Sequence, residues 1–308
     1  MKIYHNISEF SGVNKSVVTT GTFDGVHLGH QVILNRLKEI AEKKGGETVI
    51  LTFFPHPRMV LYPEQNDLRL INTIEERIEL LKNTGIDHLI IHPFSKEFSR
   101  LSSIDFVRDI LVNQLHTHKL VIGYDHHFGR NREGTFEHLQ EYGPLYGFNV
   151  EEIPAQEIQQ INISSTKIRN SLMDGEINAA NQFLGYHYFL QGTVIPGNQI
   201  GRKIGFPTAN IKVNEWYKLI PAKGVYAVKI NIDNNTFNGM LNIGTRPTIN
   251  GAETTIEVNI FNFNEDIYNK DIKIEFVERI RHEQKFEELE SLKKQLEIDR
   301  QTTIQILN

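Results

Sequence analysis

Residues 21–30 read Gly-Thr-Phe-Asp-Gly-Val-His-Leu-Gly-His and directly follow the run Ser-Val-Val-Thr-Thr at residues 16–20. A short β-branched run of this kind is typical of a buried strand, and a helical pattern begins just after the turn. Free backbone N–H groups and the helix dipole make such a strand-to-helix turn a place where phosphate binds. His27 and His30 add two imidazole donors there, and Gly29 lets a phosphate approach the backbone closely. The alternative is an ordinary turn with two exposed histidines.

Length and composition restrict the class of protein. The chain has 308 residues, enough for two domains, and its 39% hydrophobic and 23% charged residues are typical of a soluble globular protein. It lacks a signal-peptide pattern and any apolar run near the ~18 residues of a membrane span. The absence of cysteine excludes disulfides, thiolate catalysis and cysteine-bound zinc. The net charge of −5 argues against a dedicated nucleic-acid binder. We expect a cytoplasmic protein without a membrane partner, which is a monomer or a weak homo-oligomer.

The first half of the chain alternates strand and helix signals. Continuous β-branched runs between helices are typical of a parallel sheet covered on both faces. Such a doubly wound α/β sheet binds its ligand at the carboxyl ends of its strands. The expected strands are residues 17–20, 48–53, 88–92, 119–123 and 149–153, and the expected helices are residues 31–44, 73–83 and 103–114.

The pattern changes near Gly185. From there short runs alternate apolar and polar residues, as at 226–230 and 255–260, which predicts a small closed antiparallel β-barrel. A helix at about 286–306 ends the chain. We therefore expect an α/β domain over residues 1–184 and a barrel domain with a terminal helix over residues 185–308.

Two loops that follow strands of the first half carry residues suited to a ligand. Phe54-Pro55-His56-Pro57 forms a rigid loop with an aromatic residue that suits a flat ring, although it could simply pack on the sheet. Residues 123–130 contain the neighbouring histidines His126 and His127. Adjacent side chains point apart and no third ligand is suitably spaced, so we do not expect a metal site there.

Two further segments have the composition of phosphate-binding loops. Ser164, Ser165 and Thr166 either cap the helix that follows or hold phosphates together with backbone N–H groups, with Arg169 one turn inside. Residues 197–210 hold three glycines and two cations but no Walker motif. This second segment either folds over nucleotide phosphates or forms a flexible hairpin.

Taken in order, these motifs resemble those of the bacterial bifunctional riboflavin kinase/FMN adenylyltransferases. The HxGH within residues 21–30 resembles the nucleotidyltransferase superfamily, and the whole stretch resembles its FMN adenylyltransferase branch. Residues 163–169 match that superfamily's ISSTxxR. Residues 123–134 are close to the branch pattern GxDFxFGxxRxG, with His126 in place of the usual Phe.

The second half resembles the riboflavin kinases. Residues 207–210 read Pro-Thr-Ala-Asn, the PTAN signature of that family, and residues 239–248 fit its GMxNIGxRPT segment. Glu257 lies where the family has an E-V-H-like strand, and Asn269 replaces a common Gly after the family's D-L-Y. The resemblance covers nearly the whole chain.

The resemblance implies two ATP-dependent reactions. The barrel would phosphorylate riboflavin to FMN, and the α/β domain would adenylylate FMN to FAD with release of pyrophosphate, each with Mg²⁺. The implied catalytic residues are His27, His30, Arg169 and Glu257; the nucleotide-binding residues are Gly21, Phe23, Asp24, Gly29, Ser164, Ser165, Thr166, Gly201, Lys203, Thr208 and Asn210; the flavin-binding residues are Phe54, Pro55, His56, Pro57, Asp125 and Arg281; and the metal-binding residues are Thr208 and Asn210.

The two reactions place different demands on the protein. The FMN phosphate is already largely anionic at neutral pH, so adenylylation needs no general base, whereas the riboflavin hydroxyl does. Glu257 is the candidate base, and a solvated strand glutamate is its alternative. One rival function is a nucleotidyltransferase for another phosphate substrate, joined to a non-catalytic flavin-binding barrel. Another is a flavin sensor or RNA-binding barrel without catalysis.

Overall fold

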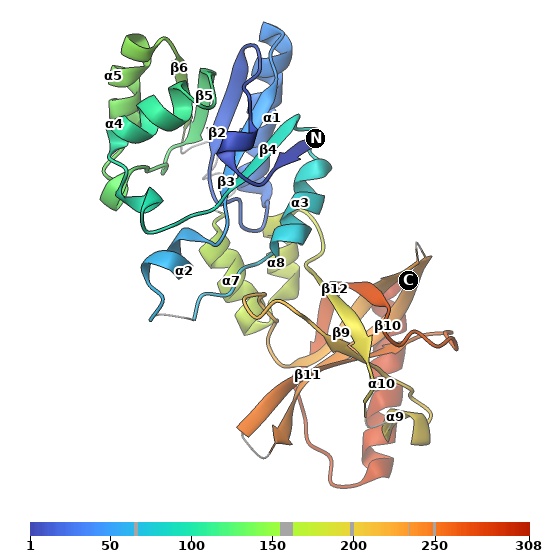
Figure 1. The fold of residues 1–308 in the computed structure, drawn as a ribbon. Helices are drawn as coiled ribbons and strands as arrows, with labels where there is room; N and C mark the ends of the chain where they lie inside the picture. The colour runs from blue at the N-terminus through green and yellow to red at the C-terminus, as the bar shows by residue number, and fades with distance from the viewer. Residues whose placement is uncertain (65–66, 155–162, 198–199, 234, 249–250) are drawn as a thin grey trace. The chain divides into compact units, whose positions relative to one another are not determined.

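The computed structural model describes residues 1–308 except 65–66, 155–162, 198–199, 234 and 249–250 (Figure 1). The chain divides into two compact units, Met1–Ser165 and Thr166–Asn308. The first holds a parallel sheet with helices and the second a closed antiparallel barrel with a terminal helix, which confirms the expected fold classes. No helix among the described residues is long and apolar enough to cross a membrane.

The first unit is built on a six-stranded sheet of order β1-β4-β3-β2-β5-β6, in which every pair is parallel. Strand β2 is buried over its whole length, because it lies inside the sheet. The chain passes from β2 to β3 on one side and later to β5 on the other, so the strand order reverses between β2 and β5. Such a switch point is where doubly wound sheets bind ligands. The strands are β1 Lys2–Tyr4, β2 Ser16–Thr20, β3 Thr48–Phe53, β4 His88–His92, β5 Thr117–Gly123 and β6 Asn149–Ile153.

Helices cover both faces of this sheet. One buried cluster, with Leu34, Leu37 and Leu81, packs α1 and α3 on the sheet, and a second joins the sheet to the segments around Phe106 and Leu139. The segment expected to be one helix over 103–114 is a short α4 followed by a π-helical stretch. The helices are α1 Leu28–Lys44, α2 Pro57–Leu61, α3 Ile74–Lys82, α4 Ser103–Asp105, η3 Phe106–Val112 and α5 Phe136–Tyr146, with single turns η1 Ile7–Glu9, η2 Phe98–Arg100 and η4 Arg130–Arg132.

The second unit is a closed barrel of order β10-β11-β8-β7-β12-β9, whose paired strands are antiparallel. Its alternating apolar side chains fill the interior, as the period-2 pattern predicts. The strands are β7 Phe189–Ile195, β8 Ala209–Lys212, β9 Gly224–Ile232, β10 Asn235–Thr248, β11 Gly251–Ile260 and β12 Asp271–Arg281, with helices α9 Ile200–Lys203 and α10 Leu289–Leu307.

Two helices precede the barrel: α7 Ser165–Asp174, whose first residue ends the first unit, and α8 Ile177–Leu184. Both are tied to the barrel. Ala222 N donates to Leu172 O at 3.0 Å, and the Asn181 side-chain amide donates to Phe276 O at 2.9 Å. The two compact units thus divide after Ser165, earlier in the chain than the expected boundary after residue 184. Where the two catalytic domains separate stays a prediction.

An ion pair attaches the terminal helix to the barrel. The Arg281 guanidinium on β12 donates to both carboxylate oxygens of Asp299 on α10, at 2.9 and 2.7 Å, and Asp299 is 1% exposed. Gln295, one turn earlier, donates to the same carboxylate at 2.9 Å. Nearby, Leu296 packs against the buried side chains Phe206 and Met240.

We expect Asp299→Ala to destabilise the second unit by roughly 3 kcal/mol, because it leaves the partly buried Arg281 without its carboxylate. The single tryptophan, Trp216, belongs to this unit, so urea unfolding followed by tryptophan fluorescence measures the loss. Glu297→Ala, an exposed position on the same helix, serves as the control and should change stability by less than about 0.5 kcal/mol. Equal unfolding midpoints for the two variants would contradict the assignment.

Candidate active sites

His27 and His30 lie at the N-terminus of α1 and stack on each other. Their ring centroids are 3.7 Å apart with planes inclined by 17°, and the His30 backbone N–H donates to His27 Nδ1 at 3.3 Å. Because Nδ1 of His27 accepts this bond, a neutral His27 carries its hydrogen on Nε2. The helix start therefore presents an imidazole N–H donor together with its free backbone N–H groups.

The surroundings keep His30 uncharged. Burial, the neighbouring His27 and the Arg77 charge together hold the pKa of His30 well below its usual value. The ring of Phe23, itself 2% exposed, lies against His30 with centroids 5.1 Å apart. His30 thus acts at neutral pH as a neutral imidazole, and the positive potential for an anion comes from the helix N-terminus and nearby cations.

The turn before α1 has an unusual backbone. Phe23, Gly25 and Val26 have φ values of 48°, 91° and 38°, in the left-handed region that non-glycine residues rarely adopt. Gly21 leads into it, and its N–H donates to Leu51 O at 3.1 Å. Such conformations persist only where surrounding contacts determine them, and they are common where backbone groups face a ligand.

Three other segments hold this turn through hydrogen bonds. The fully buried Asp24 carboxylate accepts the N–H groups of Ile71 and Asn72, at 3.0 and 3.3 Å. Thr52 Oγ1 at the end of β3 donates to Thr22 O at 3.3 Å, and Ser165 Oγ donates to Asp24 O at 2.9 Å. The expected nucleotide residue Asp24 thus faces the protein interior, where it positions the turn. Gly29, the second residue of α1, is also buried.

The Ser165 contact brings together two motifs that lie far apart in the sequence. Ser165 stands 141 residues after Asp24, yet its hydroxyl reaches the turn. Ser164, one residue earlier, is exposed. Thr166 and Arg169 belong to the second unit, where the Arg169 guanidinium donates to Thr166 Oγ1 at 3.4 Å.

Sequence reasoning missed Arg77. This arginine on α3 is fully buried, and its Nη1 lies 3.5 Å from both Thr52 Oγ1 and Phe53 O at the end of β3. A signal was available: Arg77 occupies the apolar stripe of α3, between Ile74 and Leu81. A cation on such a stripe indicates a buried charge with a specific role.

The loop 54–57 is fixed by a helix cap. His56 is 7% exposed, and its Nδ1 accepts the Arg58 N–H at 3.2 Å at the start of α2, whose first residue is Pro57. Phe54 is half-buried, and Pro55 is exposed after a cis peptide bond. The flavin contacts expected of these residues stay predictions.

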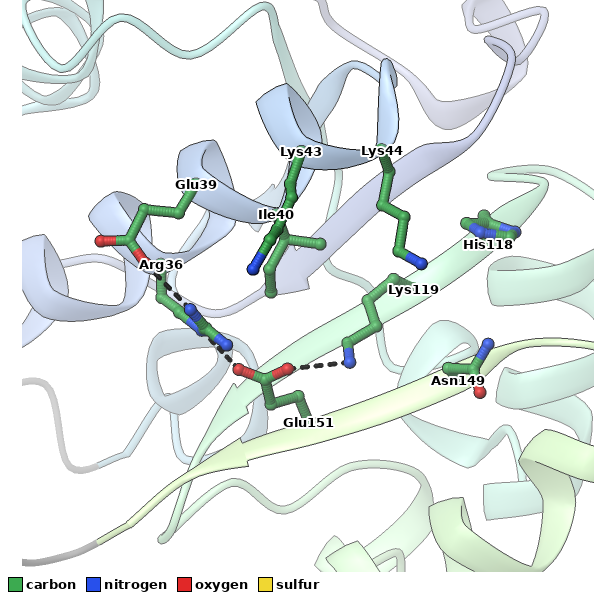
Figure 2. Close-up of a pocket in the computed structure, with 9 residues that line it drawn as sticks. All are labelled: Arg36, Glu39, Ile40, Lys43, Lys44, His118, Lys119, Asn149 and Glu151. Atoms are coloured by element: carbon green, nitrogen blue, oxygen red, sulfur yellow. Dashed lines mark hydrogen bonds and ion pairs between the residues drawn. The ribbon is translucent and has the colours of Figure 1, made fainter.

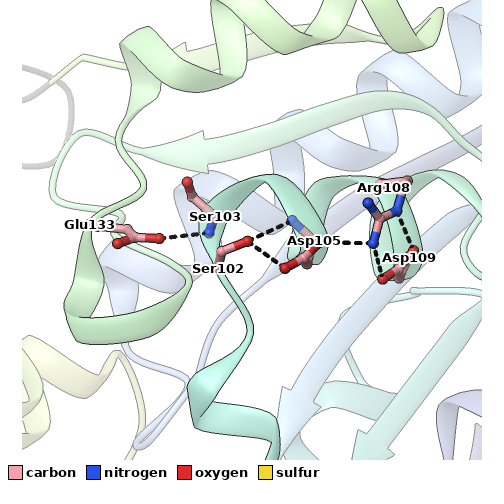
Figure 3. Close-up of polar contacts among 6 residues, drawn as sticks. All are labelled: Ser102, Ser103, Asp105, Arg108, Asp109 and Glu133. Carbon is pink, nitrogen blue, oxygen red and sulfur yellow. Dashed lines mark hydrogen bonds and ion pairs between the residues drawn. The ribbon is translucent and has the colours of Figure 1, made fainter.

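The loop after β5 is anchored to the start of α4 (Figure 3). Glu133 accepts the Ser103 N–H at 2.9 Å, and Arg130 N donates to Leu101 O at 2.7 Å. Gly129 allows the close approach: a Cβ there would lie 2.8 Å from the Ser103 backbone. Asp125, an expected flavin residue, is exposed on this anchored loop.

His126 in this loop is a second neutral histidine. Burial, and to a lesser degree the charges of His127 and Arg132, lower the pKa of His126 to about 4. An unfolded chain binds a proton on this residue near pH 6.5. Between these values the unfolded state binds more protons, so stability falls as the pH falls from about 6.5 to about 4.

We therefore expect His126→Phe to reduce the acid sensitivity of the first unit. Hydrogen exchange of the β2 and β5 amides at pH 7.5 and 5 gives the opening free energy of this region. Between pH 7.5 and pH 5, the opening free energy should fall by more in the wild-type chain than in the variant. Equal losses would show that His126 titrates at an ordinary pKa.

The barrel brings its three expected polar residues together on two strands. Glu257 on β11 pairs in register with Asn210 on β8, and Thr208 Oγ1 donates to the Glu257 carboxylate at 3.3 Å. Glu257 is half-buried and Thr208 exposed, so a ligand can reach both. Asn259 Nδ2 donates to Pro207 O at 2.6 Å, which holds the PTAN segment on β11.

A glycine-rich segment lies against these residues. A Cβ at Gly197 would lie 2.0 Å from the Asn210 side chain, and one at Gly201 would lie 2.2 Å from Phe206 O. The clash at Gly201 is with backbone, so that position requires glycine, whereas at Gly197 the Asn210 side chain would have to move. The side chain of Lys203 lies outside the described part of the structure. Arg281, expected to contact a flavin, is bound to Asp299, and its flavin contact stays a prediction.

A cavity of 540 Å³ lies elsewhere in the first unit, between the end of α1 and the beginnings of β5 and β6 (Figure 2). Its charges pair largely with one another, since Glu151 binds both Arg36 and Lys119. Lysines such as Lys43 and Lys44 in a last helical turn also compensate the helix dipole. This cavity lies at the N-terminal ends of β5 and β6, whereas the 21–30 turn follows the C-terminal end of β2. We assign the cavity no role.

Comparisons with known proteins cover nearly the whole chain. Residues 11–167 match the family model described as FAD synthetase, and residues 184–307 match that described as riboflavin kinase. The chain is 41% identical to a bifunctional riboflavin kinase/FMN adenylyltransferase of Listeria monocytogenes, over 98% of this chain and 96% of that one. It is 39% identical to the protein of the same name from Bacillus subtilis, over 94% and 92% of the two chains.

A solved structure has the same fold throughout. The crystal structure of a Streptococcus pneumoniae protein named a macrolide-efflux protein is 33% identical and has a TM-score of 0.90, covering 98% of each chain. The match extends over both units.

Proposed function

The chain belongs to the family of bifunctional riboflavin kinase/FMN adenylyltransferases, and we propose that residues 21–30 form its adenylyltransferase site and the Thr208–Glu257 pair its kinase site. The enzyme phosphorylates riboflavin to FMN and converts FMN to FAD, with ATP as the donor in both steps. The observation that carries the first assignment is the stacked histidine pair at the start of α1, of which His30 is uncharged. The hydrogen bond between Thr208 and Glu257 carries the second.

In the adenylyltransferase site an FMN phosphate oxygen attacks the α-phosphorus of ATP, and the bond to the bridging oxygen of pyrophosphate breaks. The attacking phosphate has a second pKa of about 6, so no proton has to be removed. The protein binds the two anions and stabilises charge that develops on the α- and β-phosphate oxygens. The imidazoles of His27 and His30, the N–H groups of α1 and, as the family motif implies, Ser165, Thr166 and Arg169 supply these donors.

In the kinase site the riboflavin 5′-hydroxyl attacks the γ-phosphorus of ATP and ADP leaves. Glu257 accepts the hydroxyl proton. Its hydrogen bond from Thr208 and its pairing with Asn210 hold the carboxylate beside the phosphate-binding strand.

A Mg²⁺ ion fits this second site. The Thr208 hydroxyl and the Asn210 amide would hold the ion through oxygen, the ligand atom that Mg²⁺ prefers, with substrate phosphates and water as the kind of further ligands it usually keeps. When bound, the ion neutralises phosphate charge during transfer. The cytoplasmic location and the monomeric or weakly oligomeric state stay predictions.

The direct test is to incubate the full chain with riboflavin, ATP and Mg²⁺ and to separate the flavins by chromatography. FMN should form first and FAD should follow. Conversion of supplied FMN to FAD without any phosphorylation of riboflavin would mean that the barrel is not catalytic. Failure of both reactions would contradict the proposal.

We expect His30→Ala to lower kcat for FAD formation by about 10²–10³-fold, the effect of removing one donor that stabilises the transition state. Phosphorylation of riboflavin by the same variant is the internal control, and it should hardly change because it occurs in the other unit. A parallel loss of both activities would indicate misfolding and would contradict the specific role of His30.

Glu257→Gln should have the opposite selectivity. The amide keeps the shape and hydrogen bonding of the side chain but cannot accept the proton, so riboflavin phosphorylation should fall by about 10²–10⁴-fold. Riboflavin and ATP should still bind, which equilibrium titration measures, and supplied FMN should still become FAD. A variant that forms FMN at a near-normal rate would show that Glu257 is not the base.

A further inference from the structure

His126 and Thr20 form a hydrogen bond across the switch point of the sheet. Thr20 is the last residue of β2 and directly precedes Gly21 of the phosphate turn, while His126 lies three residues after the end of β5. Thr20 Oγ1 and His126 Nε2 are 3.2 Å apart. The bond therefore joins the two strand ends between which the ligand of a doubly wound sheet binds.

Contacts with Gly123 and Phe128 hold His126 in place. Its backbone N–H donates to Gly123 O at 3.1 Å, and its ring lies nearly parallel to that of Phe128, with centroids 6.0 Å apart. Phe128 is 6% exposed and packs on Phe106 of the sheet's helical cover. His126 itself is half-buried.

The partner hydroxyl is equally constrained. Thr20 is 7% exposed in a central strand, where its β-branched side chain has little freedom. The next residue, Gly21, is bound to Leu51 O of β3, so the whole corner is fixed to the sheet. A phenylalanine, the residue that the related pattern has at position 126, cannot make the bond to Thr20.

We propose that His126 is a positioning residue of the adenylyltransferase site, whose bond to Thr20 locks the loop after β5 onto the start of the phosphate turn. The bond sets where Asp125, next in the chain to His126, stands relative to the turn 21–30. The inference rests on the proposed function, because it assumes that FMN occupies this crevice. The lowered pKa of His126 is consistent with it, since a neutral imidazole keeps one geometry over the working pH range.

A double-mutant cycle on the full-length enzyme tests this role. Thr20→Val removes the hydroxyl at nearly constant shape, His126→Phe removes the ring nitrogens, and the third variant carries both changes. Each single change should raise KM for FMN in FAD formation about three- to tenfold, the range of one lost hydrogen bond. The KM for FMN of the double variant should be no higher than that of either single variant, because all three lack the same hydrogen bond.

Two matched variants distinguish a positioning role of the bond from a general loss of stability. Thr20→Ser keeps the hydroxyl and should retain the wild-type KM for FMN. Ser16→Ala, at the other end of β2, removes the hydroxyl bonded to Leu115 O and His116 O, and should lower stability while leaving that KM unchanged. Riboflavin phosphorylation, measured on every variant, should be constant.

Additive effects of the two changes, or an unchanged KM for FMN in both single variants, would overturn the inference. Should Thr20→Val fail to fold, as judged by hydrogen exchange of β2, the comparison of His126→Phe with His126→Gln decides. The glutamine keeps a side-chain donor, so His126→Gln should have a KM for FMN close to the wild-type value. A KM as high as that of His126→Phe would count against the bond. A wild-type enzyme that makes no FAD would instead refute the proposed function.

Discussion

The buried carboxylate of Asp24 is the constraint on which the first site depends. A carboxylate without water is costly unless hydrogen bonds replace its hydration, and Asp24 accepts two backbone N–H groups just before α3. Those N–H groups lie at the positive end of that helix, which favours a negative charge. In return the side chain holds the 21–30 turn in a conformation with three positive φ angles. The turn could not keep this backbone by its local preferences alone.

The protonation states of the site follow from that geometry. Once the turn places His27 directly before α1, its Nδ1 accepts the His30 N–H, and the second ring stacks on the first. Two close imidazoles under burial and near the Arg77 charge cannot both be protonated at low cost, so His30 stays neutral. A neutral donor suits a reaction between two anions that needs hydrogen bonds and no proton transfer.

The second site meets a different chemical demand with a different structural element. A neutral hydroxyl is the nucleophile there, so a carboxylate has to stand beside the phosphate-binding residues. Strand register provides this, because β11 and β8 place Glu257 opposite Asn210, and Thr208 reaches the same carboxylate. The pair Arg281–Asp299 fastens α10 to the same barrel. In the proposed assignment, one chain uses a helix N-terminus for one phosphate reaction and paired strands for the other.

The sequence by itself determined the two fold classes and most strands, because the period of apolar residues is a local property that tertiary contacts preserve. It also supplied the candidate residues of both proposed sites, since a helix N-terminus and a strand glutamate are recognisable from their neighbours in the chain. It did not show β1, a three-residue strand that exists through pairing with β4, or the π-helical stretch after α4. Only the tertiary structure decided that Asp24 faces inward, that the Arg77 guanidinium reaches the end of β3, and that Asp299 engages Arg281. Each of these depends on partners from 18 to 48 positions away in the sequence. Burial and charge pairing at such separations are properties of the packed molecule, which no local pattern specifies.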